Sequence, residues 1–146
     1  MTERMAAVLQ HVEATKETAL ERLCELLRIP SISTQKQHRD DCRKAARWLA
    51  EELQGLGFTT SLRNVSWAEP GHPMVVGHDD ANAEKVRNGQ THVLFYGHYD
   101  VQPTDPEALW LTDPFEPCLK KTGDGRKVLV ARVASDDKGQ VMTFIE

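Results

Sequence analysis

The sequence predicts an α/β fold in which helices pack on a mixed β-sheet. Amphipathic helical patterns occupy residues 3–28 and 39–56. The rest of the chain carries short runs of β-forming residues, bounded by glycine, proline and polar clusters, which indicate strands. At 146 residues, with 40% hydrophobic and 27% charged side chains, the chain is long enough to form one domain with a buried core.

Charge, hydropathy and cysteine content exclude several classes of protein. The net charge of -4 gives no basic surplus, so we expect no nucleic-acid partner. No apolar run approaches the roughly 20 residues that a membrane-spanning helix needs, and the N-terminus lacks the apolar core of a signal peptide. The cysteines are odd in number, widely spaced and outside any CxxC motif, at Cys24, Cys42 and Cys118. This pattern is typical of reduced thiols in a cytoplasmic protein.

The first two elements are predicted to be helices. From Glu3 to Arg28, apolar residues recur at steps of three and four, and Ile29-Pro30 ends the helix because the residue before proline avoids the α region. A second helix is predicted from Arg39 or Asp40 to Leu56, with acids in its first turn and Gly57 as its stop. Either helix could instead bind a partner, but core-facing helices are far commoner.

Three strands are predicted to follow the helices. Phe58–Val65 and Pro73–Val76 are rich in β-formers, and polar or turn-rich stretches at 67–72 and 77–90 separate the strands. Val93–Tyr96 is a continuous apolar run, which suits a strand buried on both faces of a sheet, and Gly97 ends it.

The last third of the chain is predicted to contain a loop, a hairpin and a short helix. Residues 101–117 hold four prolines with Trp110 and Phe115, so this loop could wall a pocket or simply pack Trp110 on the surface. Glu116–Lys121 and Lys127–Val133 are predicted to pair across a turn containing Asp-Gly. A helix is expected over Gln140–Ile145.

His98 and Asp100 emerge where the predicted buried strand ends. In open α/β sheets this carboxyl end is where ligands usually bind. A neutral imidazole is a good zinc ligand, and a nearby carboxylate can either join the metal or accept the other ring N–H. A His-x-Asp pair is a weak motif by itself, and an ordinary polar loop explains it about equally well. Other histidines lack a spaced partner and are interpreted as surface residues: His72, His78 and His92.

Asp136 and Asp137 form a second charged group, directly after a β-branched run. Two adjacent acids at a strand end are unusual unless a cation balances them, and a carboxylate can bridge two metal ions. The alternative is a solvated turn that caps the following helix.

Taken together, four stretches of the sequence resemble the M20 family of metallopeptidases. They are LLRIPSIST, VLFY followed by GHYDVQP, LWLTDPFEP and ASDDKGQV. The similarity is to the dipeptidase branch that includes carnosine dipeptidase and cytosolic non-specific dipeptidase. It spans nearly the whole chain, and its motifs occur in order with sensible spacing. The resemblance implies a zinc-peptidase-like catalytic domain.

The resemblance also implies roles for individual residues. His98 matches a metal ligand, Asp100 matches the catalytic-site acid that orients this histidine, and Asp136 matches the carboxylate that bridges two Zn²⁺ ions. Other divalent metals could replace zinc, and Asp137 does not match a ligand. The implied reaction is hydrolysis of a dipeptide or small peptide by a zinc-activated water. A homodimer is implied for the complete enzyme.

The chain departs from the family pattern in sequence and in length. Where the family has Gly-Arg-Gly before the bridging acid, this chain has Ala131-Arg132-Val133. The family's general-base glutamate, its other metal ligands and its lid and dimerisation domain lie beyond the position of Glu146, which does not match that base. Residues 1–146 are therefore expected to be the leading part of the catalytic domain, without its full machinery. The alternatives are a non-catalytic binding or regulatory module that a partner chain completes, and a small single-metal hydrolase using His98, Asp100 and Asp136 alone.

Overall fold

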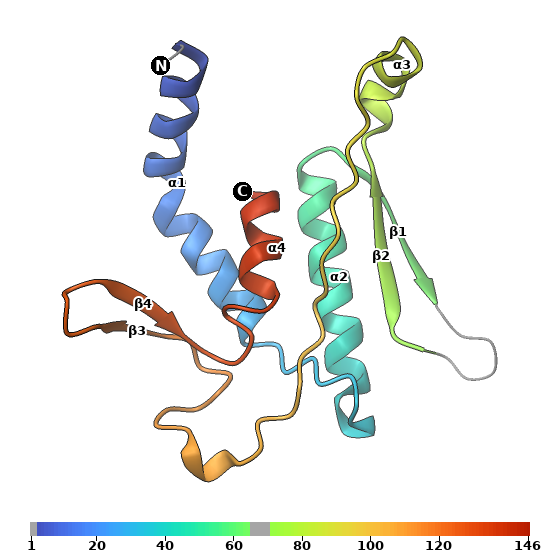
Figure 1. Ribbon diagram of the computed structural model, residues 1–146. Helices are drawn as coiled ribbons and strands as arrows, with labels where there is room; N and C mark the ends of the chain where they lie inside the picture. The colour runs from blue at the N-terminus through green and yellow to red at the C-terminus, as the bar shows by residue number, and fades with distance from the viewer. Residues whose placement is uncertain (1–2, 65–70) are drawn as a thin grey trace.

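The computed structural model describes residues 3–64 and 71–146 and confirms the α/β class (Figure 1). Its helices are α1 (Glu3–Leu27), α2 (Arg39–Gly55), α3 (Ala83–Arg87) and α4 (Lys138–Ile145). Its strands are β1 (Thr59–Asn64), β2 (Pro73–His78), β3 (Cys118–Lys121) and β4 (Lys127–Val130). Among the described helices, none combines the length and apolar character that crossing a membrane requires.

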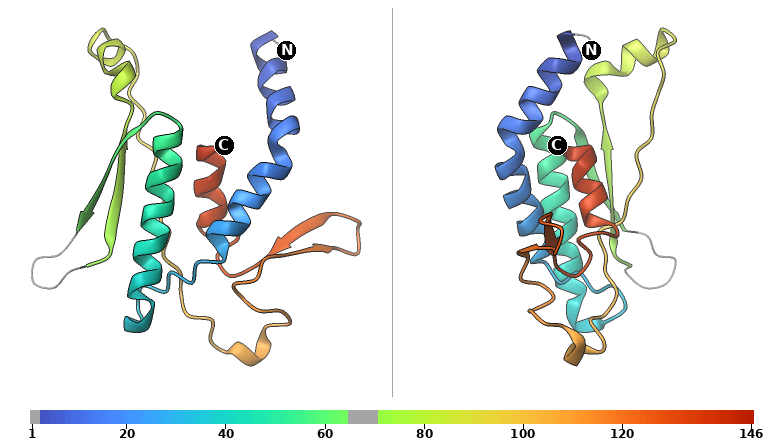
Figure 2. Two further views of the ribbon diagram at one scale, coloured as in Figure 1. Left: turned by 180° about the vertical axis from the view of Figure 1, so that it is seen from behind. Right: turned by 60° about the vertical axis from the view of Figure 1, so that its left-hand side comes forward.

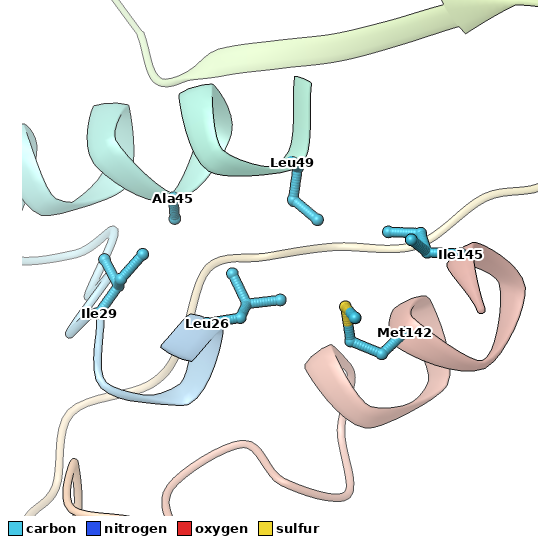
Figure 3. Close-up of a cluster of buried hydrophobic side chains, with 6 residues drawn as sticks. All are labelled: Leu26, Ile29, Ala45, Leu49, Met142 and Ile145. Carbon is cyan, nitrogen blue, oxygen red and sulfur yellow. The ribbon is translucent and has the colours of Figure 1, made fainter. Parts of the chain in front are cut away.

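The core lies where the C-terminal half of α1 meets α2 and α4, and these helices stand side by side in each view (Figures 1 and 2). The larger of the two clusters of buried apolar side chains in the described residues comes from these helices and from a residue two positions beyond α1 (Figure 3): Leu26, Ile29, Ala45, Leu49, Met142 and Ile145. Arg22 of α1 forms ion pairs with Glu52 of α2 and with Glu146, 2.8 Å from the latter's Oε1. The same helices are thus held together by apolar packing inside and by charge at the surface.

The helix ends follow the sequence signals. Asp40 and Asp41 occupy the first turn of α2, where carboxylates interact favourably with the helix dipole. Gly57, two residues beyond α2, has a φ of 90°, the left-handed conformation that glycine adopts without strain at helix ends. The predicted ends of the first two helices are therefore confirmed to within one residue.

The described strands form two separate antiparallel pairs rather than one mixed sheet. β1 pairs with β2 from Thr59 opposite His78 to Asn64 opposite Pro73, and this pair covers one side of α2 (Figure 1). β3 pairs with β4 across the predicted Asp-Gly turn. The only parallel contact in the described part of the chain is an isolated bridge between Ile32 and Val101. Val65, at the end of the first predicted strand, and most of the loop predicted at 67–72 lie outside the described residues.

The prediction of a buried strand at Val93–Tyr96 is wrong for this structure. The run is extended, but it joins neither strand pair within the described residues, and its side chains are exposed, 89% for Leu94 and 84% for Tyr96. Phe95 has an aromatic partner, since its ring centroid lies 4.7 Å from that of Phe144 in α4. The composition of the run favours a buried strand, but a strand also needs a neighbour for its backbone hydrogen bonds. No described segment supplies that neighbour.

Candidate metal site

The structure brings His98 and Asp136 together from positions 38 residues apart. Nε2 of His98 lies 3.2 Å from Oδ1 of Asp136. His98 follows the extended 91–97 segment, and Asp136 lies in the turn that leads from β4 into α4. Both line a hollow of about 610 Å³, together with Asp100, Trp110 and residues 129–135. The hydrogen bond from Trp110 Nε1 to the Thr104 carbonyl, at 2.9 Å, fixes the indole at the wall of this hollow.

Asp100 determines how the His98 ring is turned. The carbonyl oxygen of Asp100 lies 3.1 Å from Nδ1 of His98, and its carboxylate Oδ1 lies 3.2 Å from the same atom. Both are acceptors, so Nδ1 carries the proton and Nε2 faces Asp136. The other oxygen of the Asp100 carboxylate accepts a hydrogen bond from Oγ of Ser33 at 2.6 Å. No local pattern in the sequence indicates this role of Ser33, because the contact joins segments far apart in the chain.

The acids around His98 change the affinity of its ring for a proton. Burial alone lowers the pKa of His98, but the hydrogen bond to Asp136, the Asp100 carbonyl and the charges of Asp100 and Asp137 together outweigh it. The pKa is therefore raised above its usual value. The space between His98 Nε2 and the Asp136 carboxylate thus favours a positive charge, which either a proton or a cation can supply.

The spacing of these two groups fits a divalent cation. A tetrahedral zinc ion about 2.1 Å from an imidazole nitrogen and from a carboxylate oxygen separates those atoms by about 3.4 Å. The observed separation is 3.2 Å. In the described part of the chain, no group of three or more His, Cys, Asp or Glu side chains is arranged to hold a metal. Within the described residues, His98 and Asp136 are therefore a pair of candidate ligands, and Asp100 lies on the opposite side of the His98 ring.

Close backbone packing holds the turn that carries Asp136. A Cβ atom on Gly139 would lie 2.2 Å from the carbonyl oxygen of Ala134, so a side chain cannot fit there. Val133 has a φ of 69°, which is strained for a β-branched residue. The Asp136–Asp137 peptide bond is cis. The sequence signal for this tight turn was the glycine that follows Asp-Asp-Lys.

Lys138 ties the same turn to the end of α1. Its side chain is fully buried, and Nζ donates to the carbonyl oxygens of Leu26 at 2.9 Å and Ile29 at 2.7 Å. Burial lowers the pKa of Lys138 to about 7, although Coulombic interactions with Cys42, Asp100 and Asp41 act in the opposite direction. The sequence showed Lys138 as part of a charged turn and gave no sign that it would be buried.

The remaining candidates lie apart from this pair. His72 is half-buried rather than a surface residue. Its Nε2 donates to the Ser33 carbonyl at 2.9 Å, and its Nδ1 is enclosed and has no hydrogen-bond partner among the residues that the structure describes. His78 and His92 are exposed, as predicted. Glu146 is held by Arg22 at the other end of α4.

Comparison with known proteins gives a consistent set of relatives, although no family model matches the chain. The chain is 32% identical to the Cys-Gly metallodipeptidase DUG1 of Candida albicans over 92% of its own length and 28% of that protein. Its fold matches the dipeptidase Dug1p of Saccharomyces cerevisiae with a TM-score of 0.77 at 25% identity, and human carnosine dipeptidase 1 with 0.79 at 27% identity. Both matches cover 99% of this chain and 30% of the known structure.

The chain thus spans about 30% of the length of the proteins that it matches. Sequence and fold nevertheless agree on the same group of metallodipeptidases, and they do so over almost all of the chain. The homologues of the chain are thus metallodipeptidases of the M20 family, and the chain is similar to them over almost all of its length.

Proposed function

We propose that the chain contributes part of the divalent-cation site of an enzyme that hydrolyses dipeptides. His98 and Asp136 are the ligands, and Asp100 orients His98. The observation that carries the proposal is the 3.2 Å separation of His98 Nε2 from Asp136 Oδ1. The other ring nitrogen of His98, Nδ1, faces two acceptor oxygens of Asp100. The names of the relatives support the reaction class, since the Candida protein is a Cys-Gly metallodipeptidase and its human relative a β-Ala-His dipeptidase.

The chain's own residues would bind and orient rather than complete the reaction. Asp100 keeps the His98 proton on Nδ1, so the Nε2 lone pair is free for a cation, and Asp136 supplies negative charge beside it. A bound Zn²⁺ would supply a Lewis acid that polarises the peptide carbonyl and makes a water molecule acidic enough to attack near neutral pH. Catalytic zinc usually has three protein ligands, so we propose that a further protein segment completes the coordination.

Zinc affinity tests this assignment directly. We expect His98→Ala and Asp136→Ala each to weaken Zn²⁺ binding by about tenfold or more, since each removes one of two ligands. His92→Ala removes an exposed histidine from the same segment and should leave the affinity unchanged. The measurement is a competition titration with a chromophoric chelator at pH 7.5. Equal affinities for the His98→Ala and His92→Ala variants would contradict the assignment.

Hydrolysis tests the reaction. We expect Cys-Gly or β-Ala-His cleavage only when the chain is joined or mixed with a polypeptide that completes the coordination, and we expect His98→Ala to abolish it. Release of free amino acid, followed with and without a chelator, is the measurement. Cleavage that persists in the His98→Ala variant would argue against this site.

A non-catalytic binding module is the second candidate function. The exposed apolar run at Val93–Tyr96 supports it, because an extended segment with unpaired backbone groups can add to a strand of another chain. In that case we expect a stable complex with a partner chain that shows no peptide hydrolysis. Recovery of hydrolysis in the complex would instead favour the dipeptidase.

Two further properties belong to the same proposal. We propose a cytoplasmic location, which the free thiols of Cys24, Cys42 and Cys118 support. We also propose that the complete enzyme is a homodimer whose zinc centre holds two ions, with Asp136 bridging them, and that residues 1–146 form the leading part of its catalytic domain. Two zinc ions per complete subunit, measured by metal analysis, would agree with this arrangement, whereas one would contradict the bridging role.

A further inference from the structure

The carboxylate of Asp137 makes an unexpected contact for its position. Asp137 is the N-cap residue of α4, where an aspartate ordinarily accepts a hydrogen bond from a backbone N–H of its own helix. Its side chain makes no such bond. Oδ2 of Asp137 instead accepts the backbone N–H of His98 at 2.9 Å, from a residue 39 positions earlier. The carboxylate therefore binds the backbone at the end of the extended 91–97 segment rather than the helix that Asp137 begins.

Gly97 allows this contact to form. A Cβ atom on Gly97 would lie 2.9 Å from Oδ2 of Asp137 and 2.5 Å from Cγ2 of Val141. Gly97 does not have a positive φ. Glycine is needed here because a side chain would not fit, and not because of the backbone conformation. The backbone before His98 thus packs against the first turn of α4. Asp137 makes the polar contact there, and Val141 makes the apolar contact.

The contact links the two sides of the candidate metal site. Asp137 holds His98 by its backbone, while Asp100 holds the ring of His98 through Nδ1. Asp136 directly precedes Asp137, so the residue that anchors His98 belongs to the same peptide segment as the second ligand. A shift of α4 would therefore carry the backbone of His98 along with Asp136, and their 3.2 Å separation would be kept.

We propose that Asp137 is a positioning residue for the cation site, acting through the backbone of His98. This inference rests on the proposed function only in taking His98 and Asp136 as ligands. Asp137 does not contact the cation; it keeps the two ligand atoms at the distance that a cation requires. The essential feature is an acceptor oxygen, so asparagine should replace aspartate at this position, whereas alanine should not.

Amide hydrogen exchange tests the contact in the metal-free chain. We expect Asp137→Ala to speed exchange of the His98 amide about tenfold or more relative to the Leu49 amide in the core, because the amide loses its acceptor Oδ2 of Asp137. Asp137→Asn should stay within about threefold of the wild type, since its amide oxygen can accept the same bond. The control is Asp113→Ala, which removes a similar bond, 2.9 Å from the Phe115 amide, and should leave His98 unaffected. Unchanged exchange at His98 in Asp137→Ala would overturn the inference.

Zinc affinity tests the positioning role itself. Removing a residue that orients a ligand typically weakens metal binding by about 10- to 100-fold, and we expect this for Asp137→Ala. Asp137→Asn and Asp113→Ala should bind nearly as tightly as the wild type. Equal losses in Asp137→Asn and Asp137→Ala would show that charge, not the hydrogen bond, matters, and would overturn the inference; so would unchanged affinity in Asp137→Ala.

The two measurements separate this inference from the proposed function. If the wild-type chain binds no zinc, the ligand assignment fails, and with it the role of Asp137 at a cation site. The exchange data then still report whether Asp137 anchors the His98 backbone. If zinc binds and His98→Ala weakens it but Asp137→Ala does not, the ligands stand and only the positioning role is lost.

Discussion

Val133 and Val101 pack in the same small cluster but have different backbone conformations. Both are buried in a cluster with Ile32, and the half-buried Phe115 packs against this cluster. Val133 has a left-handed φ of 69°, while Val101 forms the parallel bridge with Ile32. Valine at position 133 therefore combines a packing gain with backbone strain.

The balance between these two effects can be measured by replacing each valine with glycine. Val101→Gly loses a buried side chain and gains backbone freedom, so we expect it to lower the free energy of unfolding by about 2–4 kcal/mol. Val133→Gly loses the same side chain but relieves a left-handed conformation that costs roughly 1–2 kcal/mol, so its effect should be smaller by about that amount. Urea unfolding at pH 7 provides both values. An equal or larger loss for Val133→Gly would contradict the strain argument.

The raised pKa of Cys42 predicts how the free energy of unfolding depends on pH. Burial, reinforced by the charges of Asp100 and Asp41, raises the pKa of this thiol from 9.0 to about 11. Between these values the unfolded chain has released the proton and the folded chain has kept it, so the thiol's contribution to stability is present below pH 9 and is lost as the pH rises through about 11.

We expect the wild type to lose up to roughly 2–3 kcal/mol more stability than Cys42→Ala between pH 8 and 11, since each pKa unit corresponds to about 1.4 kcal/mol. Cys118→Ala is the control for loss of a half-buried thiol. The measurement is urea unfolding of all three proteins across this range. Parallel pH profiles for the wild type and Cys42→Ala would be inconsistent with the raised pKa.

At the scale of elements, α1 has two halves with different roles. Its C-terminal half packs into the core, where Leu26 is fully buried. Its N-terminal half extends away from α2 and α4 (Figure 1), and Leu9 there is 51% exposed. The apolar periodicity is continuous along the helix, so the pattern alone does not distinguish the halves.

The same substitution in each half should therefore have different effects. Leu26→Ala removes a side chain from the packed core and should cost about 2–5 kcal/mol of unfolding free energy. Leu9→Ala should change it by no more than about 0.5 kcal/mol, since alanine also has a high helix propensity. Thermal and urea unfolding would show the contrast. A large loss for Leu9→Ala would reveal packing on the N-terminal half that this structure lacks.

At the scale of the whole molecule, the run Val93–Tyr96 is the largest mismatch between sequence and surroundings. Its side chains are apolar and exposed, and consecutive exposed apolar residues in extended backbone favour association. Leu94 lies inside this run, whereas Leu111 is equally exposed, at 92%, in the proline-rich loop. The two leucines form a matched pair.

We expect the chain to self-associate with rising concentration, and Leu94→Ser to reduce that association several-fold. Leu111→Ser changes the same side chain outside the run and should have little effect, because single exposed apolar residues are common on protein surfaces. Sedimentation velocity over a range of concentrations is the measurement. If both variants associate to the same extent, the run is not the contact surface.

The local sequence predicted most of the elements but not their assembly. Amphipathic periodicity located α1 and α2, and the Asp-Gly turn located the β3–β4 hairpin. For the candidate site, the motifs singled out His98, Asp100 and Asp136. They could not reveal the contact of Ser33 with Asp100 or that of Asp137 with His98, because each joins segments far apart in the chain.

The sequence by itself determined the helices, the hairpin and the chemistry of the candidate ligands, because these depend on residue type and on neighbours within a few positions. Only the tertiary structure decided which atoms meet. It placed Nε2 of His98 beside Asp136, buried Lys138 against the end of α1, and left the apolar run at Val93–Tyr96 exposed. The physical reason is that burial and contact depend on which segments pack together, and a strand pattern cannot become a strand without a neighbour to bond.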